Sequence, residues 1–253
     1  MPEGVAVVVG CGGIGGACAD ALGSDYTVLA VDRDAGAARK TSDSVRQIGG
    51  KCEVLVADAG EAAFGEAVAR AALSLGSVAC AVHAVAYEEH VAALDVPVES
   101  VWRSFAVGPV AAFGVFRELL RQGAAGPGAS FVAIGSLHER YAFPRCLGYN
   151  AAHAALGQVV RTLAHEWAEL RVRVNAVVPG WILTPGEEVL YDRETLVRAG
   201  SRLPFGDFGT PAQVAAAVRF LCSTEADYIS GSFLTVDGAL SAGLARLPIE
   251  ERA

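Results

Sequence analysis

The chain has 253 residues, of which 53% are hydrophobic, and a formal net charge of −8. This length suits one α/β domain with a large core, and no apolar run approaches the ~18 residues of a membrane span, so we expect no membrane-spanning segment. Because the net charge is negative and the basic residues are scattered, the composition argues against nucleic acid as a partner.

Short apolar runs, rich in Val and Ala, predict seven strands that alternate with helical patterns along the chain. We expect the strands at Val5–Val9, Tyr26–Val31, Cys52–Ala57, Val78–His83, Ser130–Ile134, Val172–Val178 and Phe233–Val236. Helical patterns lie near Ile14–Leu22, Ala35–Ile48, Glu61–Leu75, Val98–Arg121, Tyr149–Leu170 and Pro211–Leu221. This alternation predicts an α/β, doubly wound single domain over residues 1–253, with a seven-stranded, mostly parallel sheet and helices on both faces.

Two segments interrupt this pattern. The glycine-rich segment 123–128 is predicted as a loop between a helix and a strand. The segment 181–210 is long and irregular, with a short helix expected near Glu187–Ala199. Long irregular segments are usually functional, so we expect a lid over a substrate site here.

A glycine-rich turn follows the first expected strand and precedes the first helix. Gly10, Gly12 and Gly15 match G-x-G-x-x-G, the dinucleotide fingerprint of the Rossmann fold, in which the glycines allow a tight turn, close approach of the pyrophosphate and helix–strand packing. Asp32 ends the second strand, where a carboxylate binds a ribose hydroxyl and favours NAD(H) over NADP, while Arg33 beside it weakens that preference. The turn residues expected to bind the dinucleotide are Gly10, Cys11, Gly12, Gly13, Ile14 and Gly15.

Ser136, Tyr149 and the segment Asn175–Thr184, together with the glycine-rich turn, resemble the short-chain dehydrogenase/reductase family over nearly the whole chain. The resemblance implies an NAD(H)-dependent enzyme that interconverts an alcohol and a ketone on a small organic or secondary-metabolite substrate. It assigns Tyr149 as general acid/base and Ser136 as the hydrogen-bonding partner of the substrate oxygen. Further cofactor contacts are implied for Asp58, Ala59, His83, Ala84, Tyr149, His153, Pro179, Gly180, Ile182 and Thr184.

Two positions depart from the family pattern. The family has a Lys four residues after the Tyr, which binds the nicotinamide ribose and lowers the Tyr pKa; here His153 stands there, on the same helical face as Tyr149. An ammonium about 4 Å from a phenolate is worth roughly 4 kcal/mol at an effective dielectric of 20, whereas an imidazole is mostly neutral at pH 7. The family Asn that supports a relay water is Ala106, and Pro109 removes the i+4 donor of the Phe105 carbonyl, which we interpret as a helix kink rather than a water site.

The loop after Ser136 and the lid are expected to bind substrate. Carboxylates beside His90 hint at a metal, but the only histidine spacing available is from His83 to His90, so no metal site is predicted. The residues expected to contact substrate are His138, Arg145, Trp181 and Tyr191.

The cysteines and the N-terminus bear on the compartment. Six cysteines are spread without a C-x-x-C spacing, which predicts buried, reduced thiols. No basic flank precedes the first apolar run, so no signal peptide is expected and a cytoplasmic location is favoured.

Three functions remain open at this point. The first is an active dehydrogenase with His153 as catalytic ribose ligand, favoured because the fingerprint, Ser136 and Tyr149 are retained. The second is a catalytically degenerate subunit of a hetero-oligomer with an active homologue. The third is a non-redox lyase, isomerase or cyclase using Tyr149 and His153 as an acid/base pair. The family's assembly through its long helices implies a homo-tetramer or dimer, or a mixed oligomer.

Overall fold

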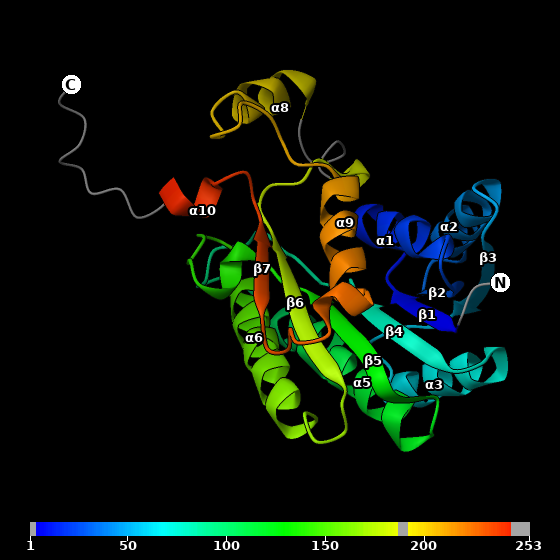
Figure 1. Ribbon diagram of the computed structural model, residues 1–253. Coiled ribbons are helices and arrows are strands. Elements are labelled where there is room, and N and C mark those ends of the chain that lie inside the picture. The colour runs from blue at the N-terminus through cyan, green and yellow to red at the C-terminus, as the bar shows by residue number, and fades with distance from the viewer. Residues whose placement is uncertain (1–3, 187–191, 244–253) are drawn as a thin grey trace.

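The computed structural model describes residues 4–186 and 192–243, in which seven parallel strands form one sheet in the order β3-β2-β1-β4-β5-β6-β7. Helices cover both faces of this sheet (Figure 1). The strands are β1 (Val5–Val9), β2 (Thr27–Asp32), β3 (Lys51–Val56), β4 (Val78–His83), β5 (Ala125–Ile134), β6 (Arg173–Pro179) and β7 (Phe233–Val236). The larger helices are α1 (Gly13–Gly23), α2 (Ala35–Gln47), α3 (Phe64–Leu75), α4 (Val98–Phe105), α5 (Ala111–Arg121), α6 (Leu147–Glu166), α8 (Arg193–Gly200) and α9 (Pro211–Cys222). The predicted doubly wound fold is confirmed, and every strand pair in the sheet is parallel.

The two faces of the sheet carry separate hydrophobic cores. Alternate residues of β1 point to opposite faces: Val7 packs with α3, α5 and α6, and Val8 packs with α1, α2 and α9. In the first core the rings of Phe116 and Phe131 stack with their centroids 4.9 Å apart. Because both faces are covered, the strands are buried on both sides and read as continuous apolar runs in the sequence.

The helix predicted near Val98–Arg121 is interrupted. Between α4 and α5 lies one turn of π-helix, η1 (Ala106–Val110), with Pro109 inside it. Pro109 has no N–H, so the normal i+4 hydrogen bond to Phe105 cannot form, and the N–H of Ala111 bonds to the carbonyl of Ala106, five residues earlier. The predicted kink therefore takes the form of a π-turn, a feature frequent at functional sites.

Other sequence-based boundaries also differ from the structure, and two segments differ most clearly. The glycine-rich segment predicted as a loop belongs in part to β5, whose first residue, Ala125, pairs with Val78 before a register irregularity. In the predicted lid, the described helix is α8, and the base is closed by backbone hydrogen bonds between Gly209 and both Trp181 and Leu183. Residues 187–191, which include Tyr191 and the start of the expected helix, lie outside the described residues.

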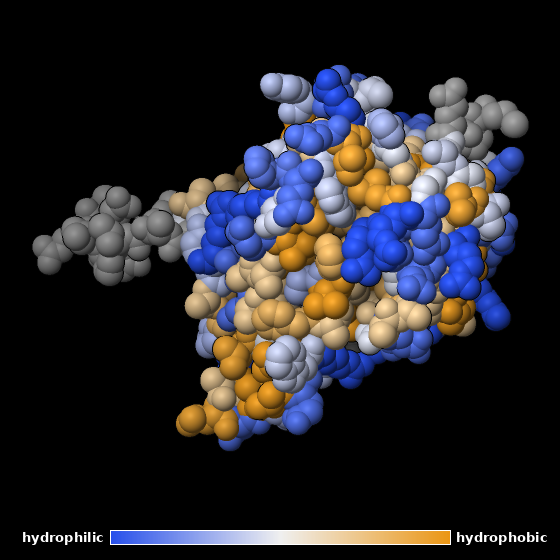
Figure 2. Space-filling model, turned by 90° about the horizontal axis from the view of Figure 1, so that it is seen from below, coloured by the Kyte–Doolittle hydropathy of each residue, from blue (hydrophilic) through white to orange (hydrophobic). Residues whose placement is uncertain are grey.

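The surface mixes apolar and polar side chains. On the face seen in Figure 2, hydrophobic and hydrophilic residues are interspersed, and hydrophobic residues also reach the lower left edge. Across residues 4–186 and 192–243, no helix combines the length and the apolar character needed to cross a membrane.

Candidate active site

The glycine-rich turn joins β1 to α1 at the carboxyl edge of the sheet. Gly10 has a φ of +92°, and a Cβ on Gly15 would lie 1.7 Å from the Gly10 carbonyl oxygen. These two positions therefore require glycine for the fold of the turn itself. A Cβ on Gly12, in contrast, would meet nothing within 4 Å, so this position faces open space in front of the α1 N-terminus. That space fits a pyrophosphate group.

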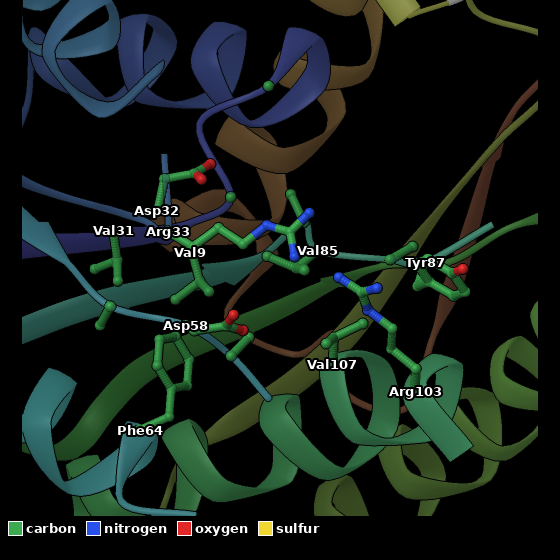
Figure 3. A pocket seen from close by; sticks show the side chains of 16 residues that line it. Val9, Val31, Asp32, Arg33, Asp58, Phe64, Val85, Tyr87, Arg103 and Val107 are labelled. Carbon is green, nitrogen blue, oxygen red and sulfur yellow. The ribbon is translucent and has the colours of Figure 1, made fainter. Parts of the chain in front are cut away.

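A cleft of about 210 Å³ lies beside this turn (Figure 3). Asp32 lines it, and its carboxylate accepts hydrogen bonds from the backbone N–H groups of Cys11 (2.7 Å) and Asp34 (2.8 Å). Arg33 and Arg103 extend into the cleft from opposite sides (Figure 3), and the Arg103 guanidinium lies 4.5 Å from the centroid of the Tyr87 ring. The cleft is also lined by Asp58, Ala59, Phe64, Ala84 and Val85.

Some of the predicted cofactor residues line the cleft and others do not. Asp32, Arg33, Asp58, Ala59 and Ala84 do come together in the cleft. Sequence reasoning missed several further lining residues, among them Phe64, Tyr87 and Arg103, because they carry no motif and come from outside the glycine-rich turn. The cleft therefore has the shape and the donor groups of a dinucleotide site.

The other predicted cofactor positions lie around the turn. The side chain of Thr184 packs against Gly13, where a Cβ would lie 3.0 Å from the Thr184 Cβ. Ile182 is buried and its bridge to Gly209 closes the base of the lid. Burial raises the pKa of the Cys11 thiol to about 12, so Cys11 serves the turn through its backbone rather than as a thiolate.

His83 ends β4 but its ring does not line the cleft. It is buried, and its Nε2 lies 2.9 Å from the carbonyl oxygen of Val107 in the π-turn. Burial lowers the pKa of His83 to about 4, so the ring is neutral and donates this hydrogen bond through Nε2–H. The His83 side chain thus ties the sheet to η1.

Ser136, Tyr149 and His153 occupy neighbouring elements at the same edge of the sheet. Ser136 precedes the short 3₁₀ turn η2 (Leu137–Glu139), and its Oγ accepts from the N–H of His138 at 3.3 Å. On α6 the rings of Tyr149 and His153 have centroids 4.3 Å apart. His153 is buried, and this burial lowers its pKa to about 3, with smaller contributions from His138 and His83. The His153 ring is therefore uncharged at neutral pH.

His138 also contacts Tyr149. Its ring makes an edge contact with Tyr149 (4.8 Å between centroids) and stacks on Phe143 (4.1 Å). The Asn150 amide nitrogen donates to the Phe143 carbonyl, which directs the Asn150 oxygen to His138 Nδ1 at 2.6 Å. Nδ1 must therefore carry the proton, and His138 Nε2 has the lone pair. Burial lowers the His138 pKa.

A small cavity of about 10 Å³ lies between the π-turn and α6. Pro109, Tyr149 and His153 are among its lining residues. This volume is at the lower limit for a single water, about 10–15 Å³. The space between the π-turn and α6 is thus nearly filled by protein.

The remaining predicted substrate residues differ in position. Arg145 is exposed and its guanidinium donates to the His90 carbonyl at 3.1 Å. Trp181 contacts the ring of Phe208 edge-on, with the centroids 5.0 Å apart. Tyr191 lies outside the described residues. Of the four, His138 is the one whose contact with Tyr149 is established.

Comparison with known proteins now decides the family. The model of a family described as enoyl-(acyl carrier protein) reductase matches residues 9–241. This chain belongs to the short-chain dehydrogenase/reductase family. Members of this family share a nucleotide-binding Rossmann fold, and the present chain has that fold.

Several relatives show how far this similarity extends. General stress protein 39 of Bacillus subtilis is 30% identical over 219 residues, which are 85% of this chain and 75% of that protein. The chain spans less than half the length of three other curated relatives that it matches over shorter stretches, namely 35%, 27% and 47%.

Two solved structures of this short-chain dehydrogenase/reductase fold contain bound cofactors. A 7α-hydroxysteroid dehydrogenase complexed with NADH and 7-oxo glycochenodeoxycholic acid is 26% identical with a TM-score of 0.86, covering 94% of both chains. The angucycline C-6 ketoreductase LanV with bound NADP is 25% identical with a TM-score of 0.86, covering 95% of this chain and 96% of that one. Both forms of the nicotinamide cofactor therefore occur among these relatives.

Proposed function

We propose that this short-chain dehydrogenase/reductase interconverts a ketone and an alcohol on a small organic or secondary-metabolite substrate, with NAD(H) as cofactor, and that it favours reduction at neutral pH. The observation that carries this proposal is the arrangement of Ser136 and Tyr149 at the same edge of the sheet as the dinucleotide cleft. NAD(H) bound there would supply or accept the hydride.

The roles of this chain's own residues follow from their chemistry. Ser136 donates a hydrogen bond to the substrate carbonyl oxygen and orients it. Tyr149, as a neutral phenol, donates its proton to that oxygen as the ketone becomes an alcohol. In the oxidative direction Tyr149 would have to accept a proton, and the neutral His153 supplies no positive charge to stabilise the phenolate. Reduction therefore suffers less than oxidation from the loss of the Lys.

The preference for NAD(H) rests on Asp32. Its carboxylate is held in the cleft by two backbone N–H groups, where it would repel the 2′-phosphate of NADP. Arg33 and Arg103 line the same cleft and reduce this repulsion, so we propose a preference for NAD(H) rather than an exclusion of NADP.

A non-redox function is the second candidate, and one observation favours it. His138 Nε2 carries a lone pair, and its ring contacts Tyr149, so the two side chains together form an acid/base pair. His138 suits this role better than His153, whose pKa of about 3 makes it a poor base. A lyase or isomerase of this kind would turn over substrate without changing the redox state of the cofactor.

The testing experiment combines binding and turnover. NADH and NADPH are titrated by intrinsic fluorescence, and a panel of ketones and alcohols is followed by NADH absorbance in wild type and Tyr149→Phe. We expect NADH to bind to both proteins, and ketone reduction to fall at least 100-fold in Tyr149→Phe. NADH binding without any absorbance change would support the non-redox function or a partner subunit, and absence of nucleotide binding would overturn the proposal.

A homo-tetramer or dimer is proposed through α4 to α6, where Val98, Trp102 and Leu147 are exposed large hydrophobics. A mixed oligomer with a homologue uses the same surface. Light scattering on the purified chain distinguishes a homo-oligomer from a monomer that needs a partner.

A further inference from the structure

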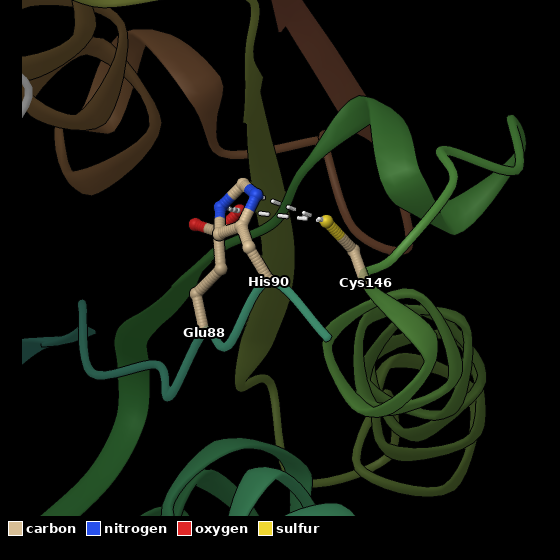
Figure 4. Close-up of side chains that lie close together, drawn as sticks. All are labelled: Glu88, His90 and Cys146. Carbon is tan, nitrogen blue, oxygen red and sulfur yellow. Dashed lines mark hydrogen bonds and ion pairs between the residues drawn. The ribbon is translucent and has the colours of Figure 1, made fainter. Parts of the chain in front are cut away.

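Three metal-ligating side chains meet at one point near the catalytic helix (Figure 4). Glu88 and His90 lie in the segment after β4, and Cys146 immediately precedes α6. One ligand atom of each lies within 4.8 Å of the others. The sequence did not reveal this group because Cys146 and His90 are 56 residues apart in the chain.

The distances suit a tetrahedral ion. Cys146 Sγ lies 3.8 Å from His90 Nδ1 and 3.9 Å from Glu88 Oε1. With Zn–S bonds of about 2.3 Å and Zn–N or Zn–O bonds of about 2.0 Å, a tetrahedral ion holds the sulfur about 3.5 Å from each nitrogen or oxygen ligand. The two distances from sulfur therefore need to shorten by only a few tenths of an ångström, and the ligand atoms of His90 and Glu88 lie within 4.8 Å of each other. Glu88 and His90 are partly exposed and have the freedom to do so.

The two ring nitrogens of His90 face different partners. Its Nε2 lies 3.0 Å from Glu88 Oε1. Its Nδ1 faces Cys146 (Figure 4), so this is the nitrogen that would ligate the ion through its lone pair.

The backbone holds the two segments together without an ion. The N–H of Val91 donates to the Arg145 carbonyl at 2.9 Å, and Val91 and Cys146 form an isolated bridge. Arg145 has a φ of +67°, a left-handed conformation that turns the chain so that Cys146 faces His90, and its side chain donates to the His90 carbonyl. The ligands therefore come from two segments that are fixed relative to each other.

We propose that Glu88, His90 and Cys146 form a binding site for a thiophilic divalent cation of the Zn²⁺ class. Thiolate, imidazole and carboxylate are together the donor set that Zn²⁺ prefers, and three protein ligands leave a fourth position for water or a substrate oxygen. The ion replaces the proton on the Cys146 thiol, because the thiolate is the form that ligates a metal. Binding is therefore tighter at higher pH.

This site adjoins the proposed catalytic residues but does not depend on the dinucleotide. The backbone N–H of Asn150 donates to the Cys146 carbonyl at 2.9 Å, so Cys146 lies one helical turn before Tyr149 and Asn150. The side chain of Asn150 also orients His138. Glu88 and His90 are close enough to act electrostatically on His138. An ion here places a positive charge and an open coordination position at the edge of the substrate site.

Metal binding to the full, untagged chain tests the proposal directly. Zn²⁺ stoichiometry is measured by equilibrium dialysis, and Co²⁺ replaces Zn²⁺ as a spectroscopic probe. We expect one ion per chain and a near-ultraviolet thiolate-to-cobalt charge-transfer band. Cys146→Ser should abolish that band, and both Cys146→Ser and His90→Ala should weaken binding by at least ~10-fold. Glu88→Gln should weaken binding less than either.

Matched controls are available in the same chain. Cys52→Ser changes a buried thiol of β3 whose sulfur donates to the Glu53 carbonyl, and His165→Ala changes an exposed histidine of α6, so both should bind the ion as wild type does. Zn²⁺ binding unchanged in Cys146→Ser, or no binding near one equivalent in the wild type, overturns the site. NADH titration in the same samples shows separately whether the dinucleotide site is intact.

Discussion

At the scale of single residues, the phenol of Tyr149, the proposed acid/base, has neutral imidazole rings around it. His153 and His138 both contact the Tyr149 ring, and burial is the main cause of the lowered pKa of each. His83 adds a third buried, neutral ring close enough to influence His153. With no fixed positive charge on these rings, proton donation by Tyr149 is easier than proton abstraction.

His153→Lys should therefore restore base character to Tyr149. An ammonium about 4 Å from the phenolate is worth roughly 4 kcal/mol at an effective dielectric of 20, and the cost of burying the Lys reduces this gain. We expect alcohol oxidation at pH 7 to rise about tenfold, with its pH profile shifted to lower pH, while ketone reduction changes less. Initial rates in both directions across pH check this. His165→Lys, on the exposed part of the same helix, should change neither rate, and equal effects of the two variants would contradict the argument.

At the scale of helices and strands, two local backbone features shape the site. The glycine-rich turn brings the α1 N-terminus to the cleft, and the π-turn at Pro109 brings the Val107 carbonyl to His83. Both follow from local chemistry, namely the missing Cβ of Gly15 and the missing N–H of Pro109.

Two substitutions in the turn should separate folding from cofactor binding. Gly15→Ala places a Cβ 1.7 Å from the Gly10 oxygen, so we expect a loss of stability of about 2 kcal/mol or more. Gly12→Ala meets open space and has a φ of −70° that Ala readily adopts, so the apo protein should melt within about 2 °C of wild type. Its NADH affinity should fall about tenfold or more, because the methyl group occupies the space of the pyrophosphate. Thermal melts with and without NADH test both, and a stable Gly12→Ala that binds NADH normally would place the pyrophosphate elsewhere.

Local sequence patterns predicted most helices and strands well. Features that depend on contacts between distant parts of the chain could not be predicted from the sequence. The strands Val5–Val9, Val78–His83 and Phe233–Val236 have the predicted bounds because each is a buried apolar run with clear turn residues beside it. The start of β5 was missed because Ala125 pairs with Val78 through contacts that no local pattern encodes. Arg103 in the cleft was missed for the same reason, since its neighbours there come from other elements.

At the scale of the whole molecule, the sheet lies between two helical layers. Ionisable side chains at the carboxyl edge of the sheet are therefore shielded from water. His83 lies at the end of the central strand β4, and His153 lies on α6 beneath the same edge. Both rings are buried, so the fold that positions them also keeps them neutral. Charging either ring is therefore linked to unfolding.

The stability of the fold should fall as the pH falls below about 6.5. The folded-state pKa values of His153 and His83 are about 3 and about 4, below the value near 6.5 expected for unfolded histidine, so the unfolded chain binds more protons between these limits. The free energy of unfolding then decreases toward acid, by up to about 1.4 kcal/mol per pH unit for each histidine. His153→Gln removes one of these groups, so its slope between pH 6 and pH 4 should be shallower by up to that amount. Urea denaturation at several pH values measures the slopes. His165→Gln, at an exposed histidine, should keep the wild-type slope; a wild-type slope in His153→Gln would show that His153 is protonated in the folded protein.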